Sequence, residues 1–198
     1  MRSLRSSRLA AVLLASIFAC GGVPPPAPPG AATVDAKAPI ANFAHVRDGL
    51  FRGGHPDHDG LEYLQRLGVK TILDLEIGDL IEATPAEIHE EEETAKEMGF
   101  HFVRLPLSAF QPFVSDDEMN RVLRILGDAD QAPVYVHCKH GQDRTGLVVG
   151  LERVFNEGWE PGKAYAEMRA LGFHPAFFGL NHYFKWKTGI GEKATARE

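Results

Sequence analysis

The chain has 198 residues, of which 44% are apolar and 24% are charged. This is the size of one domain with some additional sequence, and the apolar content suits a chain that buries a core, so full disorder and a multi-span membrane protein are excluded. The formal net charge of −6 argues against a nucleic-acid-binding protein, which usually presents a basic face. The two cysteines, Cys20 and Cys138, are too few for a disulfide framework.

The N-terminal segment, residues 1–19, has the composition of a secretory signal peptide. Three arginines, at positions 2, 5 and 8, precede an apolar run from Leu9 to Ala19. The run is too short to cross the ~30 Å hydrocarbon core of a bilayer as a permanent helix. We therefore predict an exported protein. The alternative is a buried helix, although the run has no amphipathic pattern.

Cys20 follows this run and indicates a lipid anchor. Residues 17–20, Ile-Phe-Ala-Cys, resemble a bacterial lipobox, in which the cysteine is acylated and becomes the new N-terminus. Residues 20–40 are rich in Pro, Gly and Ala, which favours a semi-rigid tether over a packed core. The sequence thus predicts a periplasmic or outer-membrane/cell-envelope lipoprotein that is lipidated at Cys20 and folded over 41–198. Cleavage at a site without a lipid is the alternative.

The folded part alternates strand-like and helix-like segments. Strand-like segments are short apolar or β-branched runs, whereas helix-like segments place apolar residues three and four apart. The strand-like segments are residues 42–51 (one or two strands), 69–75, 100–105 and 133–136. The helix-like segments are residues 57–67, 85–98, 145–157, 161–171 and 176–187. A further helix is predicted to begin at a capping box formed by Ser115 and Glu118. This order predicts an α/β, three-layer fold, in which helices flank both faces of a mostly parallel sheet of four to five strands.

Several other patterns have ordinary structural explanations. The acidic stretch 90–93 is typical of a solvated helix face, and Arg52 is interpreted as a brace of the fold. A group that looks faintly metal-binding is explained by a loop and a helix start: His55, Asp57, His58 and Asp59. Aromatic residues near the C-terminus are predicted to take part in core and C-terminal helix packing: Phe173, Phe177, Phe178, Tyr183, Phe184 and Trp186.

The segment that follows the strand ending at Val136 carries the candidate chemistry. It reads HCKHGQDRTG over residues 137–146. In a parallel sheet, ligands bind beyond the carboxyl ends of the strands, and the amides of such a turn together with the next helix start bind an anion. The same positive environment favours the thiolate form of Cys138, which is the nucleophilic form. The predicted phosphate-binding residues are Lys139, His140, Gly141, Gln142, Asp143 and Arg144.

Residues 137–146 resemble the HC-x5-R-[ST]-G signature of the cysteine-dependent protein tyrosine and dual-specificity phosphatases. Residues 51–76, FRGGHPDHDGLEYLQRLGVKTILDLE, also resemble the opening strands and first helix of small members of that family. The resemblance implies a protein tyrosine phosphatase-like fold and a reaction that needs no metal and no cofactor. It implies these roles: Cys138 attacks phosphorus and forms a phosphocysteine, Arg144 holds the phosphoryl oxygens, Thr145 donates to the sulfur, and His137 orients the loop.

The resemblance leaves the identity of the general acid open. Relatives with a mobile acid loop carry an aspartate ahead of the capped helix, but residues 106–109 contain no acid. Asp116 and Asp117 lie later, where acidic side chains stabilise a helix start. Loops that end in Asp-Arg-Thr-Gly resemble a subgroup of bacterial and lipid-directed phosphatases whose acid lies in the loop itself. We therefore predict Asp143 as the acid and keep Asp116 and Asp117 as alternatives.

The sequence therefore predicts a phosphomonoester hydrolase for phosphotyrosine/phosphoserine-type proteins or small phosphoesters. In the resembling class, bases such as Lys139 and His140 accompany phosphoinositide or inositol-phosphate substrates, which are the alternative, although Gln142 and Glu76 depart from that pattern. The competing classes are a catalytically inactive phosphate-binding envelope module and a rhodanese-like sulfurtransferase, whose loop lacks the Arg-Thr-Gly ending. We expect no nucleic acid as a partner. We expect the protein to be attached to a membrane through the lipid on Cys20.

Overall fold

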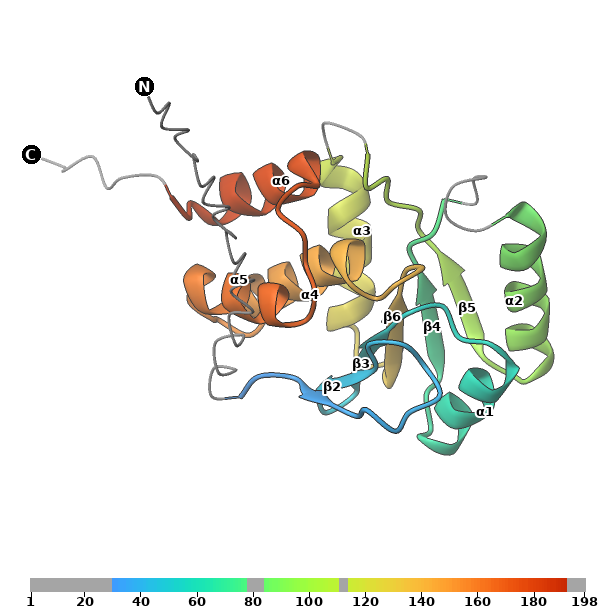
Figure 1. The fold of residues 1–198 in the computed structure, drawn as a ribbon. Coiled ribbons are helices and arrows are strands. Elements are labelled where there is room, and N and C mark those ends of the chain that lie inside the picture. The colour runs from blue at the N-terminus through green and yellow to red at the C-terminus, as the bar shows by residue number, and fades with distance from the viewer. Residues whose placement is uncertain (1–29, 78–83, 111–113, 192–198) are drawn as a thin grey trace, which may run out of the picture.

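The computed structural model describes residues 30–77, 84–110 and 114–191. Its centre is a six-stranded sheet in the order β1-β2-β3-β6-β4-β5 (Figure 1). The strands are β1 (Thr33–Val34), β2 (Ala44–Arg47), β3 (Leu50–Gly53), β4 (Thr71–Asp74), β5 (His101–Arg104) and β6 (Val134–His137). Strands β3, β6, β4 and β5 are parallel, and β2 and β1 extend one edge in antiparallel pairs. The predicted α/β fold with a mostly parallel sheet is confirmed, but the sheet has six strands rather than the predicted four to five, because β1 lies in the segment predicted as a tether.

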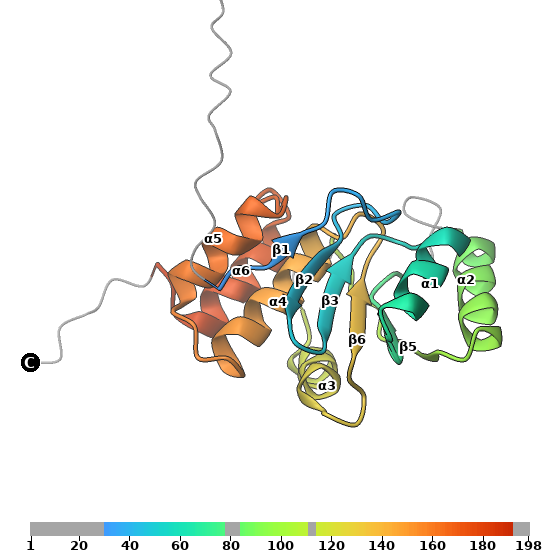
Figure 2. The ribbon, with the colours of Figure 1, turned by 90° about the horizontal axis from the view of Figure 1, so that it is seen from below.

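Helices cover both faces of this sheet (Figures 1 and 2). On one side lie α1 (His58–Arg66) and α2 (Pro85–Glu97), and on the other α3 (Asp116–Gly127), α4 (Asp143–Phe155), α5 (Pro161–Ala170) and α6 (Phe178–Thr188). Alternate side chains of β6 supply the two cores, since Val134 and Val136 join the larger core while Tyr135 joins the smaller one, with α1 and α2. In the part of the chain that the structure describes, every helix is too short or too polar to cross a membrane.

Local sequence signals set the helix starts. Asp57 caps α1 by accepting the N–H of Gly60, and Ser115 caps α3 by accepting the N–H of Glu118. A complete capping box lies at the start of α2, where the side chain of Thr84 accepts the N–H of Glu87 and the Glu87 carboxylate accepts the N–H of Thr84. Helix α4 begins at Asp143, two residues earlier than predicted.

Residues 30–40 take part in the fold, although their composition predicts a tether. Thr33 and Val34 pair with β2, and Ile40 is buried in the smaller core. The N–H of Ala32 donates to Glu167 at 2.6 Å. A two-residue edge strand needs little hydrophobic sequence, which is why composition alone does not indicate it. The predicted signal peptide and Cys20 lie outside the described residues.

The prediction that the acidic stretch 90–93 is solvated is wrong for one residue. Glu91 is only 4% exposed. It lies three residues after Ile88 and four before Ala95, both of which are buried, so these three residues share the inner side of α2. The helix therefore turns one carboxylate toward the sheet and the others toward solvent.

The predicted packing of the C-terminal aromatic residues is confirmed for some of them and wrong for others. Phe178 and Trp186 are 80% and 57% exposed, because they lie on the outer side of α6. Tyr183 and Phe184 lie on its inner side and are buried, as is Phe173. The periodicity of a short helix thus separates the aromatic residues into two groups.

A buried ion-pair network joins α4 to α5. The guanidinium of Arg153 binds both carboxylate oxygens of Glu167, at 3.0 and 2.9 Å, and one oxygen of Glu157 at 2.6 Å. The side chains of Arg153 and Glu167 are 2% and 3% exposed. Paired in this way, the two buried charges avoid the large penalty of an uncompensated charge.

Replacing Glu167 with alanine will lower the free energy of unfolding by about 3 kcal/mol, because Arg153 then stays buried without its bidentate partner. Chemical denaturation measures this. Glu160→Ala is the matched control, since Glu160 is exposed at the start of the same helix and should change stability by less than about 0.5 kcal/mol. Equal losses in the two variants would contradict the role assigned to the network.

Candidate active site

The carboxyl ends of the parallel strands converge on one loop, residues 138–142. Cys138 follows β6 directly and is 2% exposed. The N–H of Leu75, after β4, donates to the carbonyl of His137 at 3.0 Å, and the N–H of Leu107, after β5, donates to Leu75 at 3.1 Å. The loop therefore lies at the carboxyl-terminal end of the parallel strands, as predicted from the sequence.

The carbonyl groups of this loop are held from outside by donors from the opening part of the fold. These bonds run from the N–H of His55 to Lys139 (3.2 Å), from the side chain of Asn42 to His140 (2.8 Å) and from Arg52 to Gly141 (2.6 Å). Because the N–H of a trans peptide points opposite to its C=O, the amides of His140 and Gln142 are directed to the concave side. The loop thereby offers donors to an anion.

Gly141 is required by this packing. Its φ is +67°, in the left-handed region that favours glycine. A Cβ at this position would overlap the backbone of Gly53 and Gly54 far inside van der Waals distance. The loop and the end of β3 can approach this closely only because no side chain separates them.

The variant Gly141→Ala will lose at least about 100-fold in kcat/KM, because a backbone shift of about 1 Å in a catalytic loop has an effect of that order. Steady-state kinetics on a phenyl phosphate substrate measures this. Gly158→Ala is the control, since Gly158 also has a positive φ but its Cβ would meet open space. A Gly141→Ala enzyme as active as the control would refute the steric argument.

Two buried guanidinium groups lie next to the phosphate loop. Arg144, in the first turn of α4, is 3% exposed and donates to the carbonyl of Leu75 at 3.2 Å. Arg52 is fully buried, and its bond to Gly141 confirms it as a brace. Burial lowers the pKa of Arg52 to about 10, although the charges of Glu167 and Cys138 act in the opposite direction, so it stays cationic at neutral pH. Its proximity to the sulfur is a feature that the sequence does not indicate.

Asp143 is tied to a loop that is distant in the sequence. Its carboxylate accepts the N–H of His174 at 2.6 Å, and the Nδ1 atom of the same histidine lies 3.2 Å from both oxygens. The Asp143 side chain is 12% exposed, so it is mostly covered but still reached by solvent. Thr145 is buried, and its hydroxyl has no hydrogen-bond partner among the described residues, so its bond to the sulfur stays a prediction.

The alternative acids have other surroundings. Asp116 accepts the hydroxyl of Tyr183 at 2.7 Å and the ammonium of Lys187 at 3.1 Å. These hydrogen bonds lower the pKa of Asp116, so its carboxylate stays ionised and links α3 to α6. Asp117 is exposed. Asp116 therefore has a structural role in the contact between these two helices.

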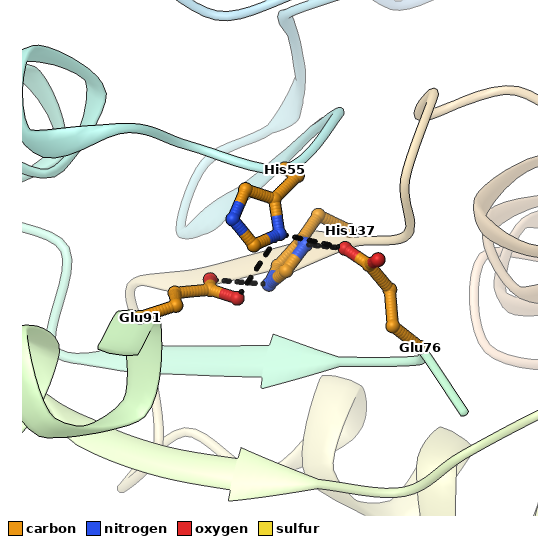
Figure 3. A group of neighbouring side chains, drawn as sticks. All are labelled: His55, Glu76, Glu91 and His137. Carbon is orange, nitrogen blue, oxygen red and sulfur yellow. Dashed lines mark hydrogen bonds and ion pairs between the residues drawn. The ribbon is translucent and has the colours of Figure 1, made fainter. Parts of the chain in front are cut away.

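Behind the phosphate loop lies a buried group of side chains that we call the His–Glu cluster: His55, Glu76, Glu91 and His137 (Figure 3). Burial alone would lower the pKa of His137, but the carboxylates of Glu91, Asp74 and Glu76 outweigh burial and raise it to about 9. Burial also opposes the protonation of His55, yet Glu76 and Glu91 raise its pKa.

These four residues offer two imidazole nitrogens and two carboxylates, which is a donor set that a metal ion can use. The faint metal-binding pattern in the sequence contains only His55 of this set. Asp57 instead caps α1, and His58 is two-thirds exposed and faces Glu62.

An aromatic rim, formed by Phe110 and Phe177, adjoins the loop through His174. The ring of Phe177 lies 6.3 Å from that of His174, which binds Asp143, and 5.6 Å from that of Phe110. Phe110 is 61% exposed. Exposed aromatic side chains beside an anion-binding loop suit a ligand that carries both a phosphate and an apolar group.

A buried cysteine and an arginine on one strand–loop–helix segment, with the loop amides facing inward, define the site of a cysteine-dependent phosphatase. The sequence model of the tyrosine phosphatase family matches residues 38–174. The dual specificity protein phosphatase TpbA of Pseudomonas aeruginosa is 32% identical over 175 residues, 87% of this chain and 73% of that protein. The inositol diphosphatase DSP4 of Arabidopsis thaliana is 36% identical over 118 residues, 58% of this chain and 56% of that protein.

Solved structures agree with the fold. The crystal structure of P. aeruginosa TpbA has a TM-score of 0.65 at 28% identity, over 80% of this chain and 91% of that chain. The core catalytic domain of the PP-IP phosphatase SIW14 from S. cerevisiae has a TM-score of 0.59 at 24% identity, over 68% of this chain and 78% of that chain, and supports the fold alone. The chain belongs to the tyrosine phosphatase family and is a phosphatase of the tyrosine/dual-specificity type.

Proposed function

We propose that the chain hydrolyses phosphomonoesters through a phosphocysteine on Cys138. The sulfur attacks phosphorus, the bond from phosphorus to the leaving oxygen breaks, and Asp143 gives its proton to that oxygen. Water then attacks phosphorus, Asp143 takes a proton from the water, and the S–P bond breaks, which releases inorganic phosphate and restores the thiolate. Thr145 donates a hydrogen bond to the departing sulfur.

One observation carries this proposal. A short loop begins with Cys138, leads directly into the helix turn that carries Arg144, and has its carbonyls bound from outside. Donors fixed in advance around the transferring phosphoryl group stabilise the charge of the transition state. A solved complex of a cysteine-to-serine variant of TpbA with phosphotyrosine, at 26% identity and a TM-score of 0.61, supports the same reading.

The aromatic rim favours phosphotyrosine on proteins as the substrate. An aryl phosphate places its ring several ångströms above the phosphorus, where the rings of Phe110 and Phe177 can pack against it. These side chains contribute apolar area without charge, which helps a peptide substrate more than a polyphosphate. Phosphoserine, which has no ring, should gain less from the rim.

An inositol phosphate is the second candidate substrate, because Lys139 and His140 add basic groups to the loop and several relatives are named inositol diphosphatases. Two acids oppose it. Glu76 is buried behind the loop. Hydrogen bonds from Thr84 lower the pKa of Glu87, and the charge of Lys139 lowers it further, so Glu87 lies near Lys139. A polyphosphate bound at Lys139 would face Glu87 directly, and the buried charge of Glu76 would repel it from behind the loop.

A substrate panel tests the choice between these candidates. We expect kcat/KM for a phosphotyrosyl peptide to exceed that for inositol diphosphates and for a phosphoseryl peptide. Phe110→Ser should raise KM for the phosphotyrosyl peptide about 2- to 10-fold, which corresponds to an aromatic contact of 0.5–1.5 kcal/mol. Trp186→Ser, at an equally exposed aromatic residue on α6, is the control. A preference for inositol diphosphates, unchanged by Phe110→Ser, would favour the second candidate.

We also propose that the protein is exported and held at a membrane by a lipid on Cys20. The basic start, the apolar run and the following Pro-rich segment support this. Metabolic labelling with a fatty-acid analogue tests it, since label should appear in the full chain and disappear in Cys20→Ser. Label that persists in the variant would contradict the anchor.

A further inference from the structure

We propose that the His–Glu cluster binds one divalent first-row metal ion, with Zn²⁺ as the best match. The site is separate from the reaction proposed above, although His137 immediately precedes Cys138 and links the two. It departs from the expectation, drawn from the resemblance, that the protein holds no metal.

The four side chains come from four different elements and converge (Figure 3). Nδ1 of His55 lies 2.9 Å from an oxygen of Glu76 and 3.3 Å from an oxygen of Glu91. His137 lies between the same carboxylates, with Nε2 3.0 Å from Glu91 and Nδ1 3.7 Å from Glu76. One ligand atom from each residue can be chosen so that all four lie within 4.8 Å of one another. A tetrahedral Zn²⁺ site with bonds of 2.0–2.2 Å has edges of about 3.3–3.6 Å, so the widest pairs must close and the pairs at 2.9 and 3.0 Å must open slightly.

The hydrogen bonds within the cluster are too few for a finished polar core. Both oxygens of Glu91, both ring nitrogens of His137 and Oε2 of Glu76 are buried without a hydrogen-bond partner among the described residues. The 3.0 Å contact between His137 and Glu91 is short, yet it lacks the alignment of a hydrogen bond. Nitrogen and oxygen atoms that crowd together without aligned bonds are typical of ligands whose lone pairs face a common ion.

The charge of the cluster also suits a divalent cation. Glu76 and Glu91 bring two carboxylates into a site where their side chains are 0% and 1% exposed. Such groups are costly to bury unless opposite charge compensates them. The neighbouring Asp74 has its own partner, since Arg104 binds it at 2.9 Å, so it does not compete for the ion. Protons on His55 and His137, whose pKa values the same carboxylates raise, offset this charge before an ion binds, and a divalent ion would bind in exchange for those protons.

A pocket gives an ion access to the cluster. It has a volume of about 250 Å³, lies between the start of α1 and the inner side of α2, and has His55 and Glu91 in its wall. Three further carboxylates line it: Asp57, Glu87 and Glu90. A cleft lined by one sign of charge concentrates counterions, so this pocket should attract cations.

The donor atoms select among cations. Ca²⁺ and Mg²⁺ prefer sites built from oxygen alone, whereas imidazole nitrogen with carboxylate oxygen suits Zn²⁺ and its first-row neighbours. Four protein ligands without an open position are typical of a structural zinc site. The ion would tie α2 and the ends of β3, β4 and β6 together behind the phosphate loop.

Metal titration of the Cys138→Ser protein tests the proposal, since removing the thiol eliminates zinc binding at the active site. After chelation and dialysis, we expect calorimetry to show one Zn²⁺ per chain, and Co²⁺ to give the intense visible absorption of a four-coordinate site without a thiolate charge-transfer band. Binding should weaken by more than about 100-fold in His55→Ala and in Glu91→Gln, because even changes behind metal ligands have effects of 10- to 100-fold. His58→Ala, at the mouth of the same pocket, is the matched control.

Circular dichroism of each variant separates lost binding from lost folding. Should His55→Ala not fold, the near-isosteric Glu91→Gln provides the same test. The proposal is overturned if the Cys138→Ser protein binds no metal, or if Glu91→Gln and a folded His55→Ala bind as well as the control. The measurement involves no turnover, so its failure would leave the proposed phosphatase reaction untouched.

Discussion

Replacing Cys138 with serine will abolish turnover of p-nitrophenyl phosphate, by a factor on the order of 10⁴ or more. The substitution hardly changes the volume of a side chain that is 2% exposed, so the loop should keep its shape. It replaces the thiol with a hydroxyl, which is a much weaker nucleophile toward phosphorus. The amides and the guanidinium that bind phosphate are unchanged. A protein that only binds phosphate would therefore keep its full affinity for phosphate in this variant.

Two measurements separate these possibilities. Rapid acid quench of the wild-type enzyme with radiolabelled substrate should trap a covalent phosphoenzyme, which is absent in Cys138→Ser. Calorimetry should show that the variant still binds vanadate or phosphate, which reports an intact loop. Cys20→Ser makes the same chemical change outside the domain and should keep full turnover. Residual activity within tenfold of wild type in Cys138→Ser would exclude the phosphocysteine mechanism.

The phosphate loop can be predicted from sequence because all of its chemistry lies in one contiguous segment, residues 137–146. Its place at the end of a parallel strand follows from the alternation of strands and helices. The helix starts are predictable for a similar reason, since the caps Asp57 and Ser115 act on amides only three residues away. Signals of this kind act locally and do not depend on the rest of the fold.

The His–Glu cluster could not be predicted in this way. His55 and His137 are 82 positions apart in the sequence, yet the parallel pairing of β3 with β6 places the strand ends that carry them side by side. Glu91 reads as one member of an acidic run, and only the packing of α2 on the sheet turns it inward. The bond from Arg52 to Gly141 has the same origin, because it joins β3 to the loop that follows the neighbouring strand β6. Contacts of this type appear once the register of the sheet is known.

The contact between Asp143 and His174 belongs to the same class and bears on the general acid. The loop before α6 packs against the phosphate loop, and a Cβ on Gly172 would touch the side chain of Gln142. This packing aligns the N–H of His174 with the carboxylate of Asp143 at 2.6 Å. The carboxylate is therefore oriented by the backbone of a distant segment, as expected for a group that must present a proton in one direction.

Replacing Asp143 with asparagine will lower kcat/KM by about 10²- to 10⁴-fold on a phosphotyrosyl peptide, because general acid–base catalysis contributes an effect of that size. The loss should depend on the leaving group. p-Nitrophenolate departs without much protonation, so its ester should lose less than the peptide, whose phenolate is more basic. A plot of rate against leaving-group basicity should become steeper in Asp143→Asn than in the wild type.

Asp116→Asn is the matched control, since it makes the same change in a carboxylate that links α3 to α6 through Tyr183 and Lys187. We expect it to reduce stability slightly and to leave the dependence on leaving group unchanged. The assignment of Asp143 is wrong if its variant loses less than tenfold, or if all substrates lose equally, since a merely distorted loop would slow every ester alike. A steeper dependence on leaving-group basicity in Asp116→Asn would instead assign the role of general acid to Asp116.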